Sequence, residues 1–281
     1  MLDFIKNIPI DEAQVANDVK SILQKGLGKY SEKDALRIIL NCIDLTTLEG
    51  ADTKEKVNAL CEKGLSYNQK GKDIPNVAAI CVYPTFAKQV SEKLKNSGIK
   101  TACVAGAFPA GQSPLFVKLI EVKYAVDEGA DEIDMVISRG TFLEGDYQTI
   151  FDEVVAIKNA CGNTHLKVIL ETGELQTLTN VRIASDISIA AGADFIKTST
   201  GKINPAATEE AFYIMLQSIK AYYEATGKMI GIKPAGGISV PYQALNYFML
   251  INHVLGEKWL NNIYFRVGAS RLADKILEKI S

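Results

Sequence analysis

Two lysines, Lys197 and Lys233, each lie inside a short apolar segment that ends in glycines. The segments are residues 193–201 and 229–237, and their composition is typical of buried strands. Lysine is rarely buried without a partner or a catalytic task. A neutral amine attacks carbonyl groups and forms imines, so one of the two lysines is a candidate nucleophile. The structural alternative is that one or both amines pair with a carboxylate or extend to solvent.

The spacing of strands gives this pair of lysines a specific chemical consequence. Neighbouring strands lie ~4.8 Å apart, so two inward-pointing amines approach to within roughly 6 Å. At an effective dielectric of about 20, two positive charges at that distance repel by about 3 kcal/mol, which corresponds to about two pKa units. We therefore expect one lysine to be the nucleophile, and the other to lower its pKa and help to relay protons.

Polar side chains also interrupt other apolar segments near their ends. Asp134 lies between Ile133 and Met135, which predicts a carboxylate inside a sheet that transfers protons, pairs with a lysine, or does both. The set suits proton transfer and imine chemistry better than metal hydrolysis, because it contains acids, amines and a thiol without histidine. Its other members are Asp44, Thr46, Cys81, Lys167 and Glu171.

Three glycine-containing turns follow consecutive strand-like segments near the end of the chain. Backbone N–H groups in such turns, and at the helix starts that follow them, bind phosphate. Residues 200–203 do not match a Walker A loop, because the spaced first glycine and the Ser or Thr after the lysine are absent. We expect phosphate binding by Gly201, Lys202, Gly236, Gly237, Ser239, Gly268 and Ser270.

The order of the segments predicts the fold that positions these residues. Continuous apolar runs, typical of parallel strands covered on both faces, alternate with amphipathic helical stretches. This alternation predicts a TIM (βα)8 barrel in one domain of residues 1–281, with a helical cap at 1–37 across the bottom of the barrel at 38–281. A doubly wound sheet is the alternative, but the first run lacks its glycine fingerprint. The expected strands are 38–45, 77–83, 101–106, 132–138, 165–171, 194–199, 229–234 and 264–268.

Composition restricts the class of protein. The chain has 281 residues and a net charge of −2, which gives no basic excess for a nucleic-acid partner. We expect no membrane partner, because no apolar run reaches the ~18 residues of a membrane span, and no signal peptide, which predicts a cytoplasmic protein. The five cysteines are expected to be reduced and buried. With two histidines and no zinc-like spacing we expect no metal and no cofactor.

Several segments together resemble the deoxyribose-phosphate aldolase family, in the same order and over roughly residues 38–280. The resemblance implies a metal-free class I aldolase on a TIM barrel. It further implies reversible cleavage of 2-deoxy-D-ribose 5-phosphate to acetaldehyde and D-glyceraldehyde 3-phosphate, a small phosphosugar as partner, and a homodimer. The segments are 43–48, 79–84, 129–136, 167–175, 195–202, 231–237 and 266–270.

The resemblance also assigns roles to the candidate residues. It implies that Lys197 forms the Schiff base, that Lys233 perturbs it, and that Asp134 works with a water in proton transfer. The turn residues above fall where the family holds phosphate. The remaining candidates are expected to contact the substrate: Asp44, Thr46, Cys81, Lys167 and Thr200.

Two departures from the family pattern bear on function. Ser239 stands where the family often has a basic residue at the phosphate, and Arg271 is the residue expected to compensate. The chain ends at Ser281, close behind its last helix, without the terminal tyrosine of some relatives. Two other functions remain open: a transaldolase-like lysine-dependent aldolase with a ketose donor, and a catalytically silent phosphosugar-binding protein.

Overall fold

The structure, a computed structural model, describes residues 9–281, which form a closed barrel of parallel strands. The strands hydrogen-bond in the order β7-β6-β5-β4-β3-β2-β1-β8. Parallel bridges Ile232–Phe265 and Ala235–Gly268 join the two ends of this sheet and close it. The fold is therefore the TIM barrel expected from the sequence. Its strands are β1 (Ile43–Thr46), β2 (Ala79–Val82), β3 (Lys100–Ala105), β4 (Glu132–Val136), β5 (His165–Ile169), β6 (Phe195–Lys197), β7 (Gly231–Lys233) and β8 (Val267–Ala269).

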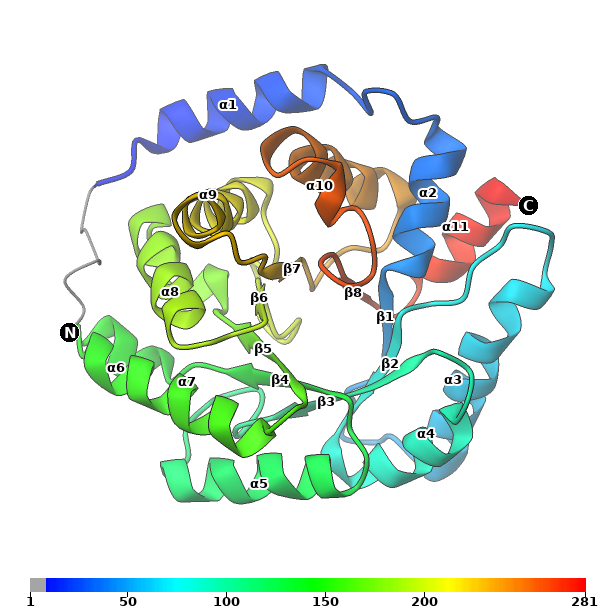
Figure 1. Ribbon diagram of the computed structural model, residues 1–281, viewed down its shortest axis with the longest axis horizontal. Helices are drawn as coiled ribbons and strands as arrows, with labels where there is room; N and C mark the ends of the chain where they lie inside the picture. Colours follow the sequence, from blue (N-terminus) through cyan, green and yellow to red (C-terminus); the bar gives the residue numbers. More distant parts are fainter. Residues whose placement is uncertain (1–8) are drawn as a thin grey trace.

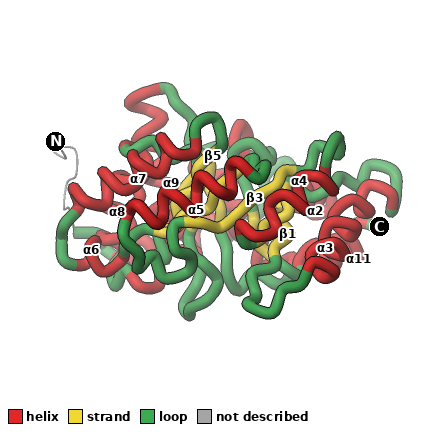
Figure 2. Tube along the Cα trace, turned by 90° about the horizontal axis from the view of Figure 1, so that it is seen from below, coloured by secondary structure: helices red, strands yellow, loops and turns green. Residues whose placement is uncertain are grey.

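Helices form the outer layer around the strands, as Figure 1 shows from one end and Figure 2 from the side. Most of them connect one strand to the next, which is the βα repeat of this fold. They are α1 (Glu12–Gln24), α2 (Glu32–Asn41), α3 (Lys54–Ser66), α4 (Ala87–Leu94), α5 (Leu115–Asp127), α6 (Arg139–Leu143), α7 (Tyr147–Cys161), α8 (Leu178–Ala190), α9 (Glu209–Thr226), α10 (Pro241–Val254) and α11 (Leu272–Ile280).

Several helix starts are encoded by a hydroxyl residue directly before the first turn. Thr53, Thr177 and Thr208 adopt extended backbone geometry, and the side chain of each accepts a hydrogen bond from a backbone N–H of the first turn of α3, α8 or α9. Such caps typically stabilise a helix by about 1 kcal/mol. They fix where each loop from the barrel mouth becomes a helix.

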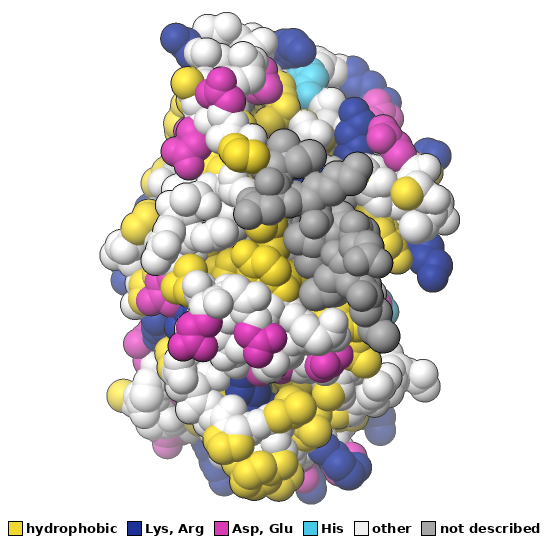
Figure 3. Space-filling view, turned by 90° about the vertical axis from the view of Figure 1, so that its left-hand side faces the viewer, with side chains coloured by type: hydrophobic (Ala, Val, Ile, Leu, Met, Phe, Trp, Pro, Cys, Tyr) yellow, Lys and Arg dark blue, Asp and Glu magenta, His cyan; other side chains and the backbone are white. Residues whose placement is uncertain are grey.

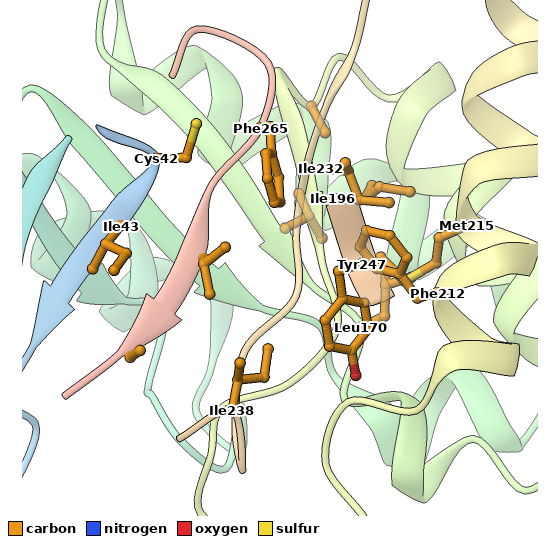
Figure 4. Packing of buried hydrophobic residues seen from close by; sticks show 14 of the residues in the cluster. Cys42, Ile43, Leu170, Ile196, Phe212, Met215, Ile232, Ile238, Tyr247 and Phe265 are labelled. Carbon is orange, nitrogen blue, oxygen red and sulfur yellow. The ribbon is translucent and has the colours of Figure 1, made fainter. Parts of the chain in front are cut away.

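The main core lies between the barrel and its helices. Along β6 and β7, Ile196 and Ile232 are in register and point outward, on the side where Phe212 and Met215 of α9 lie (Figure 4). All four side chains are buried. Because side chains alternate along a strand, the residues on either side of these isoleucines point into the barrel, and these include both predicted lysines.

Phe195 lies two residues before Lys197 on β6, so its ring also points into the barrel. A Cβ on Gly231, its neighbour in register on β7, would lie 2.3 Å from that ring, so only glycine fits there. The ring of Phe195 therefore packs beside the polar part of the barrel, with its centre 6.0 Å from the Nζ atom of Lys167.

The structure corrects two sequence-based predictions at the start of the chain. Residues 38–41 end helix α2 and do not begin strand β1, which starts at Ile43. Helix α1 packs on α9 and α10, and α2 packs on α10 and α11. Both helices thus lie at the periphery in Figure 1, and neither lies across the bottom of the barrel as a cap.

The described surface mixes charges of both signs, and Figure 3 shows acidic and basic side chains interspersed on one face. Exposed apolar side chains gather on α5, where Phe116 is 64% exposed, Ile120 66% and Tyr124 47%. These three residues follow each other at helical spacing on one stripe of α5. Within residues 9–281, no helix is both long and apolar enough to cross a membrane.

Candidate active site

The register of the strands brings the predicted acid and amines together inside the barrel. Lys197 of β6 lies directly opposite Lys233 of β7, and Asp134 of β4 lies opposite Lys167 of β5. Each of these side chains is at most 3% exposed. Residues that are far apart in sequence therefore share one buried polar site.

Asp134 is the hub of this site. Its Oδ2 atom accepts from the Nζ of Lys197 at 2.8 Å and from the Nζ of Lys233 at 2.7 Å. Its Oδ1 atom accepts from the Nζ of Lys167 at 2.9 Å. The nitrogens of Lys197 and Lys233 are thus no more than about 5.5 Å apart, the sum of their two contacts with the shared oxygen. That separation agrees with the distance expected from strand spacing.

A deeper tier of charges continues below Asp134. Arg266, in the segment before β8, donates to Oε1 of Glu132 at 2.6 Å and to Oδ1 of Asp44 at 2.8 Å. Glu132 also accepts from Lys167 at 2.6 Å, and Asp44 accepts from Lys233 at 2.5 Å. We call the complete set the barrel ion cluster: Asp44, Glu132, Asp134, Lys167, Lys197, Lys233 and Arg266.

The three lysines of the cluster differ in the direction of their pKa shifts. Burial, and then the positive charge of Lys233, lower the pKa of Lys197 against the opposing pull of Asp134. Burial also disfavours the charged forms of Lys167 and Lys233, but their carboxylate neighbours outweigh it and raise the pKa of both. Lys197 is therefore the amine of the cluster that loses its proton most easily.

This result refines the expectation that repulsion between two lysines dominates. Burial is the largest cause of the lowered pKa of Lys197, and Lys233 adds to it. A shared carboxylate also lies between the two amines and offsets part of their repulsion. Asp134 itself has a pKa well below its ordinary value, because burial is outweighed by the three lysines.

A cavity of about 740 Å³ opens above the cluster, where the strands end. Lys197 lies at its boundary, so the amine with the lowered pKa is within reach of a bound molecule. Asp44, Cys81, Asp134, Lys167 and Lys233 lie beneath the cavity and do not line it. The lining includes Thr46, Thr200, Gly201, Lys202, Gly236, Gly237, Ser239, Gly268, Ser270 and Arg271.

Glycine is required where two of the cavity loops meet. Gly236 has φ +85°, and a Cβ on it would lie 2.6 Å from the Cβ of Ala206 and 3.2 Å from the Cα of Gly201. The loops after β6 and β7 can therefore approach this closely only with glycine at position 236. Their close approach forms one wall of the cavity.

Glu171 fixes the loop that carries Thr200. Its carboxylate accepts from the hydroxyl of Thr200 and, at 3.1 Å, from the backbone N–H of the same residue. The hydroxyl of Thr200 in turn accepts from the backbone N–H of Lys202 at 3.1 Å. Burial raises the pKa of Glu171, although the bonds from Thr200 oppose the shift. Glu171 therefore shapes the cavity from behind and does not line it.

Cys81 is fully buried, and burial raises the pKa of its thiol. It belongs to an apolar cluster with Leu48 and Val104 that also includes Tyr83 and Phe108 at its edge. The thiol therefore lies below the cavity, in packed surroundings.

Sequence reasoning did not identify Arg266 and Glu132 as members of the site. For Glu132 a signal was available, since it lies two residues before Asp134 and hence on the same face of β4. Arg266 lies in an apolar segment near the end of the chain, and its partners are 134 and 222 residues away. The outer part of the cavity also has unexpected lining residues from α3, Lys56 and Lys63.

Fold and site together define a TIM-barrel protein with a lysine centre under a cavity at the carboxyl ends of the strands. A family model described as DeoC/LacD family aldolase matches residues 38–245. The chain is 40% identical over 291 residues to the human deoxyribose-phosphate aldolase, covering 99% of this chain and 91% of the relative. A Caenorhabditis elegans relative is 45% identical over 270 residues, covering 95% and 88%.

Solved structures give the same result for the fold. The deoxyribose phosphate aldolase of Aeropyrum pernix, described as a unique tetramer, superposes with a TM-score of 0.72 at 28% identity, covering 92% of this chain and 97% of that one. The chain belongs to the DeoC/LacD family of aldolases.

Proposed function

We propose that this protein is a class I aldolase that reversibly cleaves 2-deoxy-D-ribose 5-phosphate to acetaldehyde and D-glyceraldehyde 3-phosphate. One observation carries the proposal: Lys197 lies at the cavity boundary, and its pKa is lowered while those of its lysine neighbours are raised. The relatives named deoxyribose-phosphate aldolase support the choice of substrate.

The proposed chemistry starts at the Nζ atom of Lys197. The neutral amine adds to the C1 aldehyde of the open-chain sugar, and the adduct takes up one proton and loses water to give an iminium ion. That proton is returned when the iminium is hydrolysed at the end of the cycle. When the C2–C3 bond breaks, its electron pair moves to the iminium and forms an enamine. The proton of the C3 hydroxyl goes to a base, and D-glyceraldehyde 3-phosphate leaves. Protonation of the enamine at C2 and hydrolysis then release acetaldehyde and restore the amine.

We assign the proton transfers to Asp134 acting with a water molecule. Asp134 lies 2.8 Å from the Nζ atom that carries the imine, which supports this role. Its low pKa makes it a weak base alone, so the water accepts the proton of the hydroxyl while the carboxylate stabilises the resulting charge. Lys233, with its raised pKa, remains an ammonium ion beside the imine. The positive charge of Lys233 disfavours protonation of the free Lys197 amine to an ammonium ion.

The remaining cavity residues are proposed to bind the substrate. Thr46 and Thr200 offer hydroxyl groups near Lys197 for the sugar hydroxyls, whereas Asp44, Cys81 and Lys167 act from below the cavity. The phosphate is proposed to bind at the turns after β6, β7 and β8, where backbone N–H groups and basic side chains meet. These turns supply Gly201, Lys202, Gly236, Gly237, Ser239, Gly268 and Ser270.

Trapping the imine tests this function against its two competitors. The protein is mixed with 2-deoxyribose 5-phosphate, acetaldehyde or dihydroxyacetone, reduced with borohydride, and its mass is measured before the modified peptide is located. We expect adducts on Lys197 with the first two compounds. An adduct only with dihydroxyacetone would identify a transaldolase-like enzyme. Binding of the sugar phosphate without adduct or turnover would identify a binding protein.

Arg271 is expected to carry part of the phosphate affinity, because it lines the cavity one residue after Ser270. Arg271→Met should raise KM for 2-deoxyribose 5-phosphate about tenfold, the value of one charge-assisted hydrogen bond. Kinetics with unphosphorylated 2-deoxyribose should stay unchanged. Lys275→Met, which removes an exposed cation from α11, the helix that follows Arg271, is the control. Equal effects of Arg271→Met on both sugars would place the phosphate elsewhere.

We also propose that the protein forms a homodimer in the cytoplasm. The exposed stripe of Phe116, Ile120 and Tyr124 on α5 favours burial against a second copy. The five cysteines are free and buried, which suits a reducing compartment. Light scattering of the wild type and of Ile120→Glu tests the dimer, and a wild-type monomer would refute it.

A further inference from the structure

The barrel ion cluster contains more positive than negative groups. When each group carries its ordinary charge, four cations face three anions, which leaves one excess positive charge in a buried site. Buried net charge is costly, so the cluster favours the loss of one proton. The cations are Lys167, Lys197, Lys233 and Arg266, and the anions are Asp44, Glu132 and Asp134.

The contacts within the cluster determine which cation gives up its proton. Lys233 pairs with two carboxylates at 2.5 and 2.7 Å. Lys167 pairs with two at 2.6 and 2.9 Å and lies 3.9 Å from a third. Among the described ion pairs, Lys197 has one partner, Asp134 at 2.8 Å, and it shares this carboxylate with the two other lysines. The ammonium form of Lys197 is thus the least stabilised of the three.

Arg266 is the cation that creates the excess. A guanidinium keeps its charge at any pH relevant to proteins, and Arg266 is only 5% exposed. It donates hydrogen bonds to two carboxylates. Its NH1 and NH2 groups donate to Glu132 at 2.9 and 2.6 Å, and NH1 also donates to Asp44 at 2.8 Å. It lies 5.8 Å from the ring centre of Phe195, and it does not line the cavity.

We infer that Arg266 and Glu132 are positioning residues that set the charge of Lys197 in opposite directions, with Arg266 keeping the amine neutral and Glu132 limiting that effect. The inference rests on the proposed function, because it concerns the nucleophile of that reaction. Neither residue reaches the substrate. Both act through the carboxylates and lysines that they share with Lys197.

The charge of Lys197 depends on every charged group around it, because each contributes to the same electrostatic balance. The charged residues of the cluster are at most 5% exposed, so the excess charge is not dispersed into solvent. The titratable groups around the cluster are Asp44 from β1, Cys81 from β2, Cys103 from β3, Glu132 and Asp134 from β4, Lys167 from β5, Lys233 from β7, and Cys42 and Arg266 beside β1 and β8.

The pH dependence of kcat/KM tests the inference, because its acid limb reports the pKa of the amine in the free enzyme. Arg266→Met leaves three cations and three anions, so the limb should move to higher pH by about one unit. That is the effect of one charge about 10 Å away at an effective dielectric of about 20. At pH values on the acid limb, kcat/KM of Arg266→Met should be about tenfold below that of the wild type, and it should recover at high pH.

Glu132→Gln should have the opposite effect, because it leaves four cations and two anions. The acid limb should move to lower pH, and kcat/KM on the limb should rise. The double variant Arg266→Met, Glu132→Gln restores one excess cation, so its limb should return close to that of the wild type. Opposite shifts that cancel are a result that a purely structural role does not produce.

Lys118→Met is the matched control for loss of a buried cation. Lys118 is fully buried and pairs with Glu153 at 2.8 Å between α5 and α7, outside the barrel. Lys118→Met should lower the free energy of unfolding without moving the acid limb of kcat/KM. If Arg266→Met does not fold, Glu132→Gln is the deciding variant. An acid limb of kcat/KM that stays at the wild-type pH or moves to higher pH in this variant overturns the inference. Unmoved limbs, or shifts in one direction for both variants, overturn it as well.

The same samples separate this inference from the proposed function. Each variant and the wild type are treated with acetaldehyde and borohydride, and the adduct is located by mass. An unmodified wild type would refute the proposed function itself. A wild type modified at Lys197, together with variants whose limbs do not move, would refute only the roles of Arg266 and Glu132.

Discussion

Lys197→Met is expected to abolish cleavage of 2-deoxyribose 5-phosphate, with kcat/KM at least about 10⁴-fold below the wild type. The reason is that the covalent route needs a nucleophilic amine, and a loss of about 10⁴ corresponds to about 5.5 kcal/mol of barrier. Methionine matches the lysine stem in length, and Lys197 is 3% exposed, so the apolar packing is kept. The measurement is a coupled assay of glyceraldehyde 3-phosphate release, together with borohydride trapping.

The variant should fold, because it removes the least stabilised cation of a cluster that carries one in excess. Lys228→Met, which removes an exposed amine, should keep both turnover and the trapped adduct. Lys197→Met that still formed the adduct would show that another lysine is the nucleophile. Lys233 would then be the first candidate, since it shares the same carboxylate oxygen.

The sequence predicted the alternation of strands and helices correctly, because continuous apolar runs and amphipathic stretches are local signals. The error at the first strand has a local cause too. Ile38, Ile39 and Leu40 form an apolar run, and Ile39 and Leu40 are buried on one face of α2 before β1 begins. A short apolar run does not distinguish a strand from the end of a buried helix.

The residues around the cavity were predictable for a geometric reason. In a parallel barrel the carboxyl ends of all strands meet on one side, so polar and glycine residues that follow the strands converge. All seven turn residues expected at the phosphate line the cavity, as do Thr46, Thr200 and Lys197. Their convergence follows from the fold alone, while their contacts with phosphate remain a proposal.

The charge balance of the barrel was not predictable from sequence. It depends on which carboxylate reaches which amine, and these partners lie between 33 and 222 residues apart. The motif spacing identified Lys197 and Lys233 as a pair. It did not reveal that the amine of Lys233 contacts two carboxylates, whereas the amine of Lys197 contacts one carboxylate that it shares with Lys233. Register, closure of the barrel and the buried guanidinium decide that difference.

Asp134→Asn is expected to separate the two halves of the reaction. Asp134 raises the pKa of Lys197, so its loss leaves the amine at least as neutral as before, and the imine with acetaldehyde should still form. Proton transfer should fail, because the amide has no charge to stabilise the proton on the water. Turnover should fall by roughly 10²–10⁴-fold, the usual contribution of a positioned acid or base. Trapping by mass and steady-state assays measure the two steps.

Asp131→Asn is the matched control, because it makes the same chemical change three residues earlier in the chain. Asp131 lies outside the barrel, just before β4, and its carboxylate accepts a hydrogen bond from the backbone N–H of Thr101. Circular dichroism confirms that both variants are folded, which matters because Asp134→Asn leaves three amines without their shared carboxylate. If a folded Asp134→Asn variant lost trapping and turnover together, Asp134 would serve to hold Lys197 in place and not to move protons. If both survived, the proton path would run through Lys233, whose ammonium group lies on the other side of the same oxygen.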